Sequence, residues 1–284
     1  MSDSRLHIEK NTVQETLVIP LYARALCSQK YPRLFNDATT SELIGRIDYD
    51  FASLEKKQGS LMGEFGALEV AMRQSDLAFE VRDYLASHPR AAVVNLGCGL
   101  DNTGRRCDNG MCSIYNLDLP GVIKTRDRLL PAGDRERNVA CDLNDPTWMD
   151  KIDAQEGAVF FAAGVFYYFT FDQLKALFSQ MARRFPGSVL VFDACNRRAA
   201  RLMQKTWIKS AGISDVSAYF YLNDLSELDA WKTGAETSER GYMLGYNDLR
   251  DPSVRRSFRL LARVADGLMH MRIVRMEFPA GAPT

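Results

Sequence analysis

The chain contains five short apolar runs, and stretches with helical periodicity separate several of them. Runs of this length and apolarity are typical of parallel strands that are buried on both faces of a sheet. The clearest helical stretch is Phe171 to Phe185, where apolar side chains recur every three to four residues. Strands that alternate with helices predict right-handed crossovers, and therefore an α/β fold with a doubly wound, mostly parallel sheet. The apolar runs are residues 91–96, 112–117, 138–141, 158–162 and 188–192.

The residues before the first apolar run have a different pattern. Residues 16–29, 40–47 and 64–87 carry apolar side chains at helical spacing, which predicts three helices. The third of these helices is expected to bury Phe79 along with its other apolar residues. We therefore expect residues 1–90 to form a helical N-terminal cover.

The remainder, residues 91–284, is expected to form the α/β domain, with a cap insertion at about 197–240. The regular alternation of strands and helices weakens in and after this insertion. There the local patterns predict a helix over 197–209, a short strand over 217–222, a polar loop over 233–241 and a final strand over 268–278.

Charge and hydropathy restrict the partners of such a chain. Basic and acidic residues number 36 each, so no global field favours nucleic acid or an anionic membrane surface. The polar N-terminus lacks the apolar run of a signal peptide. The longest apolar stretch, Val159 to Phe169, is about half of the roughly 20 residues that a membrane span needs. We expect a cytoplasmic protein that acts on a small molecule, with no nucleic-acid or membrane partner.

The cysteines do not indicate a disulfide framework or a metal site. All six are scattered, with no CxxC pair, which favours reduced thiols in the cytoplasm. Cys107 and Cys112 are the only close pair, and a zinc site would need two further ligands. We therefore predict no metal.

A glycine turn follows the first apolar run. Val93 to Leu96 leads directly into Gly97-Cys98-Gly99, which places two residues without Cβ where the backbone must turn sharply and approach a ligand. A dinucleotide site would favour a third glycine at position 102, to seat a pyrophosphate on the helix N-terminus. That position is Asn102, so a nicotinamide-dependent oxidoreductase is the alternative and not the first interpretation.

Acidic residues end the next two runs. Asp118 follows the second run, where a carboxylate can accept hydrogen bonds from both hydroxyls of a ribose. Asp142 follows the third, where a carboxylate can meet the amino group of adenine. A glycine turn with two such acids suits a nucleoside without a pyrophosphate, and S-adenosylmethionine is such a ligand. The alternative is that Asp118 and Asp142 simply cap helices.

Several segments together resemble the leucine carboxyl methyltransferase family, which includes bacterial polyketide O-methyltransferases of the tetracenomycin type. The resemblance rests on LGCGLDNTGRR followed by YNLDLPGVIKTRDRLL, and Asp-Leu-Pro is its most specific element. RQSDLAFEVRDYL, AAGVFYYF and YLNDLSELDAW extend it over most of the chain. It implies a seven-stranded, Rossmann-like methyltransferase fold and an S-adenosylmethionine-dependent O-methyltransferase acting on a small-molecule carboxylate or hydroxyl.

The resemblance also implies roles for individual residues in binding the cofactor. Gly97 and Gly99 would approach its amino-acid part, and Arg73 would bind its carboxylate. The contacts with adenosine would come from Asp118 at the ribose and from Asp142 and Leu143 at the adenine.

Arg73 has two interpretations. A guanidinium suits the cofactor carboxylate because it can donate two parallel hydrogen bonds to it. The alternative is a solvated charge stripe, since Arg73 shares one helical face with Asp76, Glu80 and Asp83. The residues alone favour the stripe, whereas the family resemblance favours the cofactor ligand.

Residues on the acceptor side are fewer. Tyr167 and Tyr168 follow the fourth apolar run, at the mouth where an acceptor would lie, and either could orient it or form the pocket wall. Tyr22 and Arg24 of the cover are candidates for contact with the acceptor. Arg106, which matches the second arginine of the family motif, is a further candidate. A carboxylate acceptor needs no base at neutral pH, whereas a phenol can need one, and no general base is assigned.

The chain departs from the family pattern at two places. Asn102-Thr103 stands where the family has threonine and arginine, and Ala163 stands where the family has an acid before the glycine. Both changes fall near the expected cofactor and acceptor, which leaves a non-catalytic S-adenosylmethionine-binding protein as a second alternative. The sequence does not identify the acceptor or the oligomeric state.

Overall fold

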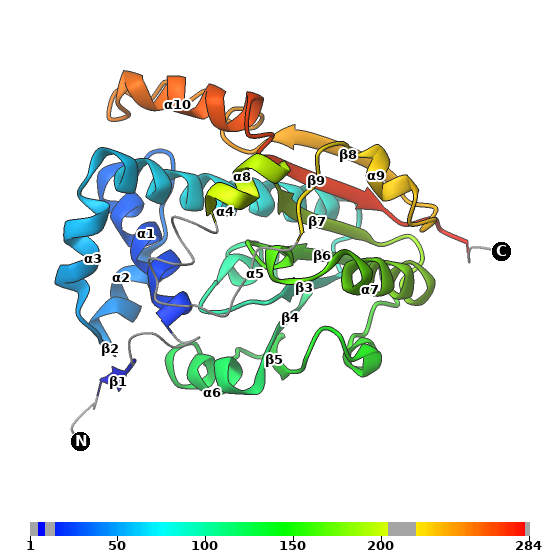
Figure 1. Cartoon of the computed structure of the whole chain (residues 1–284). Coiled ribbons are helices and arrows are strands. Elements are labelled where there is room, and N and C mark those ends of the chain that lie inside the picture. Colours follow the sequence, from blue (N-terminus) through cyan, green and yellow to red (C-terminus); the bar gives the residue numbers. More distant parts are fainter. Residues whose placement is uncertain (1–4, 9–14, 204–219, 282–284) are drawn as a thin grey trace.

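The computed structural model describes residues 5–8, 15–203 and 220–281, and has a seven-stranded sheet between layers of helices (Figure 1). The strand order is β5-β4-β3-β6-β7-β9-β8. Neighbours from β5 to β7 are parallel, whereas β9 is antiparallel to both β7 and β8. The predicted doubly wound, mostly parallel sheet is therefore confirmed. The strands are β3 (Ala92–Leu96), β4 (Ser113–Asp118), β5 (Glu136–Ala140), β6 (Ala158–Ala162), β7 (Val189–Ala194), β8 (Glu236–Gly241) and β9 (Arg272–Glu277).

Helices cover both faces of the sheet because successive strand residues point to opposite sides. Val93 and Val159 pack with α4 (Leu61–Ser87) and α10 (Arg256–Gly267) on one face. Val94 and Phe160 pack with α7 (Phe171–Arg184) and the 3₁₀ helix η1 (Pro146–Lys151) on the other. A capping box starts α7, since the Thr170 hydroxyl accepts from the Gln173 amide and the Gln173 side chain accepts from the Thr170 amide.

The N-terminal helices lie together at one end of the sheet (Figure 1). They are α1 (Glu15–Lys30), α2 (Ala38–Gly45) and α3 (Phe51–Gln58). Two short parallel strands pair in the same region, β1 (Leu6–His7) before α1 and β2 (Ile47–Asp48) between α2 and α3. A Cβ added to Gly99 would lie 3.2 Å from Leu17 Cδ2, so α1 directly covers the turn that follows β3. The cover therefore lies at the carboxyl end of the central strands.

Shorter helices complete the described fold. They are α5 (Thr103–Arg106), α6 (Pro120–Leu129), η2 (Phe166–Tyr168), α8 (Arg197–Met203) and α9 (Ser226–Asp229). Within the described residues, none of the helices is both long and apolar enough to cross a membrane. The division at residue 90 and the cap insertion at 197–240 stay predictions, and parts of the predicted helix and strand, residues 204–209 and 217–219, lie outside the described residues.

Three expectations about local structure were wrong. Residues 220–222, the described part of the strand predicted over 217–222, are not in a strand. The predicted polar loop over 233–241 contains β8, an exposed edge strand whose partner β9 supplies all of its ladder hydrogen bonds. Phe79 is not buried in the core, because it is 48% exposed and packs its ring against Tyr246 and beneath the Arg240 guanidinium. An edge strand pairs with one neighbouring strand and is mostly exposed, so its residues can be polar. Such a sequence lacks the apolar alternation that would predict a strand.

Candidate functional site

The turn between β3 and α5 has backbone geometry that favours glycine. Gly97 has φ of 66° and Gly99 has φ of 47°, a region that other L-residues rarely adopt. A Cβ at Gly97 would lie 2.6 Å from Val165 Cγ2, so the segment after β6 approaches this turn closely. Strand order reverses between β3 and β6, and the crevice at such a point is where open α/β sheets bind ligands.

Asp118 is tied to the glycine turn. Its Oδ2 accepts from the Gly99 amide at 2.7 Å, and its Oδ1 accepts from the Leu119 amide at 2.8 Å. Helix α6 begins at Pro120 with no side-chain cap, so Asp118 is not the N-cap of that helix. Burial raises the pKa of the Asp118 carboxyl, while the two amide donors oppose that rise. The carboxylate therefore lies beside the turn with lone pairs left to accept from a ligand.

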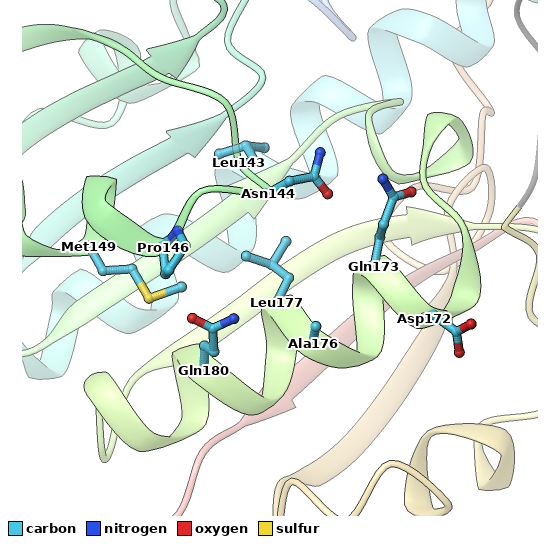
Figure 2. Close-up of a pocket in the computed structure, with 9 residues that line it drawn as sticks. All are labelled: Leu143, Asn144, Pro146, Met149, Asp172, Gln173, Ala176, Leu177 and Gln180. Carbon is cyan, nitrogen blue, oxygen red and sulfur yellow. The ribbon is translucent and has the colours of Figure 1, made fainter.

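Asp142 and Leu143 lie on the loop after β5. Asp142 is exposed and its Oδ1 accepts from the Asn144 amide at 2.9 Å, whereas the cap of η1 is Asp145. Leu143 is buried and lines a groove of about 460 Å³ between this loop and α7 (Figure 2). The groove includes none of the other predicted cofactor residues, so it adjoins the candidate site and does not define it.

Arg73 reaches the carboxyl end of β7. Its Nη1 lies 3.1 Å from Asp193 Oδ2, and Asp193 Oδ1 accepts from the Gly164 amide at 2.6 Å. The Arg73 Nε is buried and has no partner. The charge-stripe alternative is wrong, since the Arg73 side chain is only 14% exposed and both Asp76 and Glu80 are buried. Burial lowers the pKa of Arg73, but the Asp193 carboxylate raises it above the ordinary value, so the guanidinium stays charged.

The two tyrosines after β6 differ in exposure. Tyr167 is buried, which raises the pKa of its phenol well above the ordinary value. Tyr168 is 45% exposed, and its partial burial raises the pKa of its phenol as well. Tyr22 of α1 is half-buried and stacks on Phe51 with 5.9 Å between ring centroids. Contact between these tyrosines and an acceptor stays a prediction.

Arg24 is almost fully buried, whereas most arginines in proteins are exposed. Its Nη2 donates to the Leu100 carbonyl at 2.9 Å, and its Nη1 lies 3.5 Å from Asp37 Oδ2 and 3.4 Å from Asp101 Oδ1. These contacts direct the guanidinium to the glycine turn instead of an open space.

Arg106 of α5 lies against the N-terminal cover. Its guanidinium stacks over the Phe35 ring at 4.9 Å, and its Nη1 is buried without a partner. Contact of Arg24 or Arg106 with an acceptor stays a prediction.

Arg126 is a site residue that the sequence interpretation missed. Its side chain is 1% exposed, and Nη1 donates to the carbonyls of Gly99 at 3.0 Å and Asp101 at 2.6 Å. Its Nε donates to Asn138 Oδ1 at 3.0 Å. Two buried arginines, Arg24 from α1 and Arg126 from α6, therefore fix the turn from opposite elements. A charged helical segment gives no local signal that one arginine is buried.

These features fit S-adenosylmethionine. Gly97 and Gly99 form a tight turn with positive φ values, Asp118 offers acceptor lone pairs beside it, and Arg73 has an unpartnered buried Nε at the same strand edge. Among the described residues, no group of three or more His, Cys, Asp or Glu side chains could hold a metal ion. The strand order and this site define the class of Rossmann-like, S-adenosylmethionine-dependent methyltransferases.

The chain belongs to the leucine carboxyl methyltransferase family, whose sequence profile matches residues 18–182. It is 31% identical over 183 residues to the tetracenomycin polyketide synthesis O-methyltransferase of Streptomyces glaucescens, covering 64% of this chain and 66%, just under two thirds, of that protein. It is 26% identical over 265 residues to the S-adenosyl-L-methionine-dependent methyltransferase dpfgK of Gibberella zeae, covering 86% and 88%. The predicted family, enzyme class and cofactor are confirmed.

A proposed methyltransferase from Thermobifida fusca has the same fold. Its crystal structure superposes with a TM-score of 0.58 at 14% sequence identity, and the alignment covers 98% of this chain and 97% of that one. At this identity the likeness concerns the fold alone.

Proposed function

We propose that this methyltransferase transfers a methyl group to a hydroxyl or carboxylate oxygen of a small molecule. The observation that carries the proposal is the position of α1 over the glycine turn, where Leu17 packs against Gly99 and Arg24 bonds to Leu100. A helix packed on the turn restricts access to it, which favours a small acceptor over a nucleic-acid duplex. The neutral net charge and the O-methyltransferase relative from Streptomyces support the same proposal.

The chain's own residues would bind and orient the reactants. The backbone of the turn at Gly97 and Gly99 would contact the amino-acid part of the cofactor. Arg73 would bind its carboxylate, and Asp118 would accept from the ribose hydroxyls. The adenine would lie at Asp142 and Leu143. When bound, the cofactor supplies an activated methyl group on a sulfonium, so alignment and exclusion of water are the main tasks left to the protein.

Calorimetry with S-adenosylhomocysteine and NADH tests the cofactor site. We expect the wild type to bind S-adenosylhomocysteine and not NADH, and Asp118→Ala to weaken that binding by about 1.5–3 kcal/mol, the usual contribution of hydrogen bonds to a charged group. Asp83→Ala, an exposed acid on α4, is the matched control. Binding of NADH alone would favour an oxidoreductase.

Transfer of a labelled methyl group tests the acceptor class. We expect label in small aromatic hydroxy or carboxylic acids and none in DNA or RNA. Incorporation into a nucleic-acid base would contradict the proposal. A cytoplasmic location is proposed as well, and six free thiols support it.

A further inference from the structure

Glu69 of α4 is a half-buried carboxylate without a protein partner. Among the described residues, none forms a hydrogen bond or an ion pair with its oxygens. Glu64 and Glu80 of the same helix are both paired, with Lys30 and Arg275 respectively. A half-exposed carboxylate that makes no bond within the described residues can accept a hydrogen bond or a proton from a group that comes from outside the chain.

The course of α4 places Glu69 beyond the carboxyl edge of the sheet. Late in the helix, the Tyr84 hydroxyl lies beside Gly157, just before β6, whereas earlier in the helix Arg73 lies beside Gly164, just after β6. The helix therefore runs antiparallel to β6. Glu69 precedes Arg73 by four residues, which is about 6 Å further along the axis. It therefore lies about one helical turn beyond Arg73, outside the carboxyl edge of the sheet.

Groups from several elements surround this carboxylate. Arg73 of α4, Asp266 of α10, Tyr242 after β8 and Cys195 after β7 all interact with it electrostatically. Burial raises the pKa of Glu69 to about 7, Asp266 adds to the rise, and Arg73 opposes it. A base is most effective when its pKa lies near the working pH.

We propose that Glu69 is the catalytic base that accepts the proton of a hydroxyl acceptor, and that the acceptor is therefore a phenol or alcohol and not a carboxylate. The inference rests on the proposed methyl transfer. The acceptor O–H proton passes to the Glu69 carboxylate while the oxygen–methyl bond forms and the methyl–sulfur bond breaks, its electron pair remaining on sulfur. Glu69 then returns the proton to water.

The test compares Glu69→Gln, Glu69→Asp and the exposed control Glu42→Gln. The probes are methyl esters of hydroxynaphthoic acids, which offer only a hydroxyl, and naphthoic acids, which offer only a carboxylate. We expect methyl ethers from the esters and a loss in kcat of about 100-fold or more in Glu69→Gln, as for removal of a general base. Glu69→Asp should keep part of the rate, and Glu42→Gln all of it.

Two further measurements separate a base from a structural or cofactor-binding residue. Wild-type kcat/KM should rise with pH, reach half of its maximum near pH 7 and level off above it, because the base must be deprotonated. Glu69→Gln should lack this rise. The affinity for S-adenosylhomocysteine should stay within about twofold in Glu69→Gln. In carbon NMR of the ligand-free wild type, one carboxyl signal should titrate with a midpoint near pH 7, and this signal should be absent from Glu69→Gln.

The outcomes are distinguishable from failure of the proposed function. Methylation of carboxylates only, no methylation of any hydroxyl compound, full activity in Glu69→Gln, or weaker cofactor affinity in that variant would each overturn the role of Glu69. A wild type that does not bind S-adenosylhomocysteine would overturn the cofactor site itself.

Discussion

Arg73 joins the helical layer to the edge where the central strands end. Its Nη1 pairs with Asp193 while its buried Nε has no partner, so a cofactor carboxylate would complete its hydrogen bonds. We expect Arg73→Ala to weaken S-adenosylhomocysteine binding by about 1.5–3 kcal/mol in calorimetry. Arg73→Lys should be intermediate, because an ammonium keeps the charge and loses the planar fork.

The control for Arg73 is Asp83→Ala on the exposed side of the same helix. If both alanine variants bind the cofactor as the wild type does, Arg73 has only a structural role with Asp193. Comparison of melting temperatures without ligand shows how much of the effect is lost stability.

For single residues, the sequence immediately around them predicted part of the site. Gly97 and Gly99 follow an apolar run and have the positive φ values expected of a tight turn. Arg126 and Asp193 could not be predicted in the same way, because their roles depend on contacts with residues 25 or more positions distant in sequence. An arginine in a charged helix and an acid inside a strand have no local pattern that distinguishes burial from exposure.

Among the elements, α1 contacts the glycine turn through Leu17 and through the bonds of Arg24. Arg24→Met keeps most of the side-chain volume and removes bonds to Leu100, Asp37 and Asp101. We expect it to lower the free energy of unfolding by about 3–5 kcal/mol, as when one partner of a buried ion pair is removed. Arg33→Met, an exposed change just after α1, is the control.

Hydrogen exchange locates the effect of Arg24→Met. Amides of α1 should exchange faster than in the wild type, and S-adenosylhomocysteine should slow them less, because the helix is then less coupled to the turn. Unchanged exchange in α1 would show that apolar packing alone holds this helix.

The longer elements could be predicted from sequence, whereas the shortest could not. Helices α1, α4 and α7 are long enough for their apolar residues to recur several times at helical spacing. The two-residue strands β1 and β2 are too short for any period, and the polar strand β8 depends on pairing with β9. Pairing between distant segments is a property of the fold and leaves no trace in a short window.

At the scale of the whole molecule, stability should depend on pH through Asp76. This carboxyl is 2% exposed on α4, and burial, with Asp266 and Glu80 nearby, raises its pKa to about 9. The folded protein therefore holds a proton that the unfolded chain, with an ordinary pKa near 4, releases. The contribution of this proton to the free energy of unfolding is fully present below about pH 4. It is lost as pH rises toward 9, by at most about 1.4 kcal/mol per pH unit.

Asp76→Asn tests this dependence because its amide keeps the shape and can still accept from Asn247. We expect the free energy of unfolding of the wild type to fall more steeply than that of Asp76→Asn between about pH 6 and 8.5 in urea titrations. Asp83→Asn, an exposed acid on the same helix, should keep the wild-type slope. Equal slopes of the free energy of unfolding against pH in all three proteins would contradict a protonated Asp76. A flatter slope in Asp76→Asn alone would assign the bound proton to Asp76, in the layer between α4 and α10, and would distinguish it from the titration of Glu69.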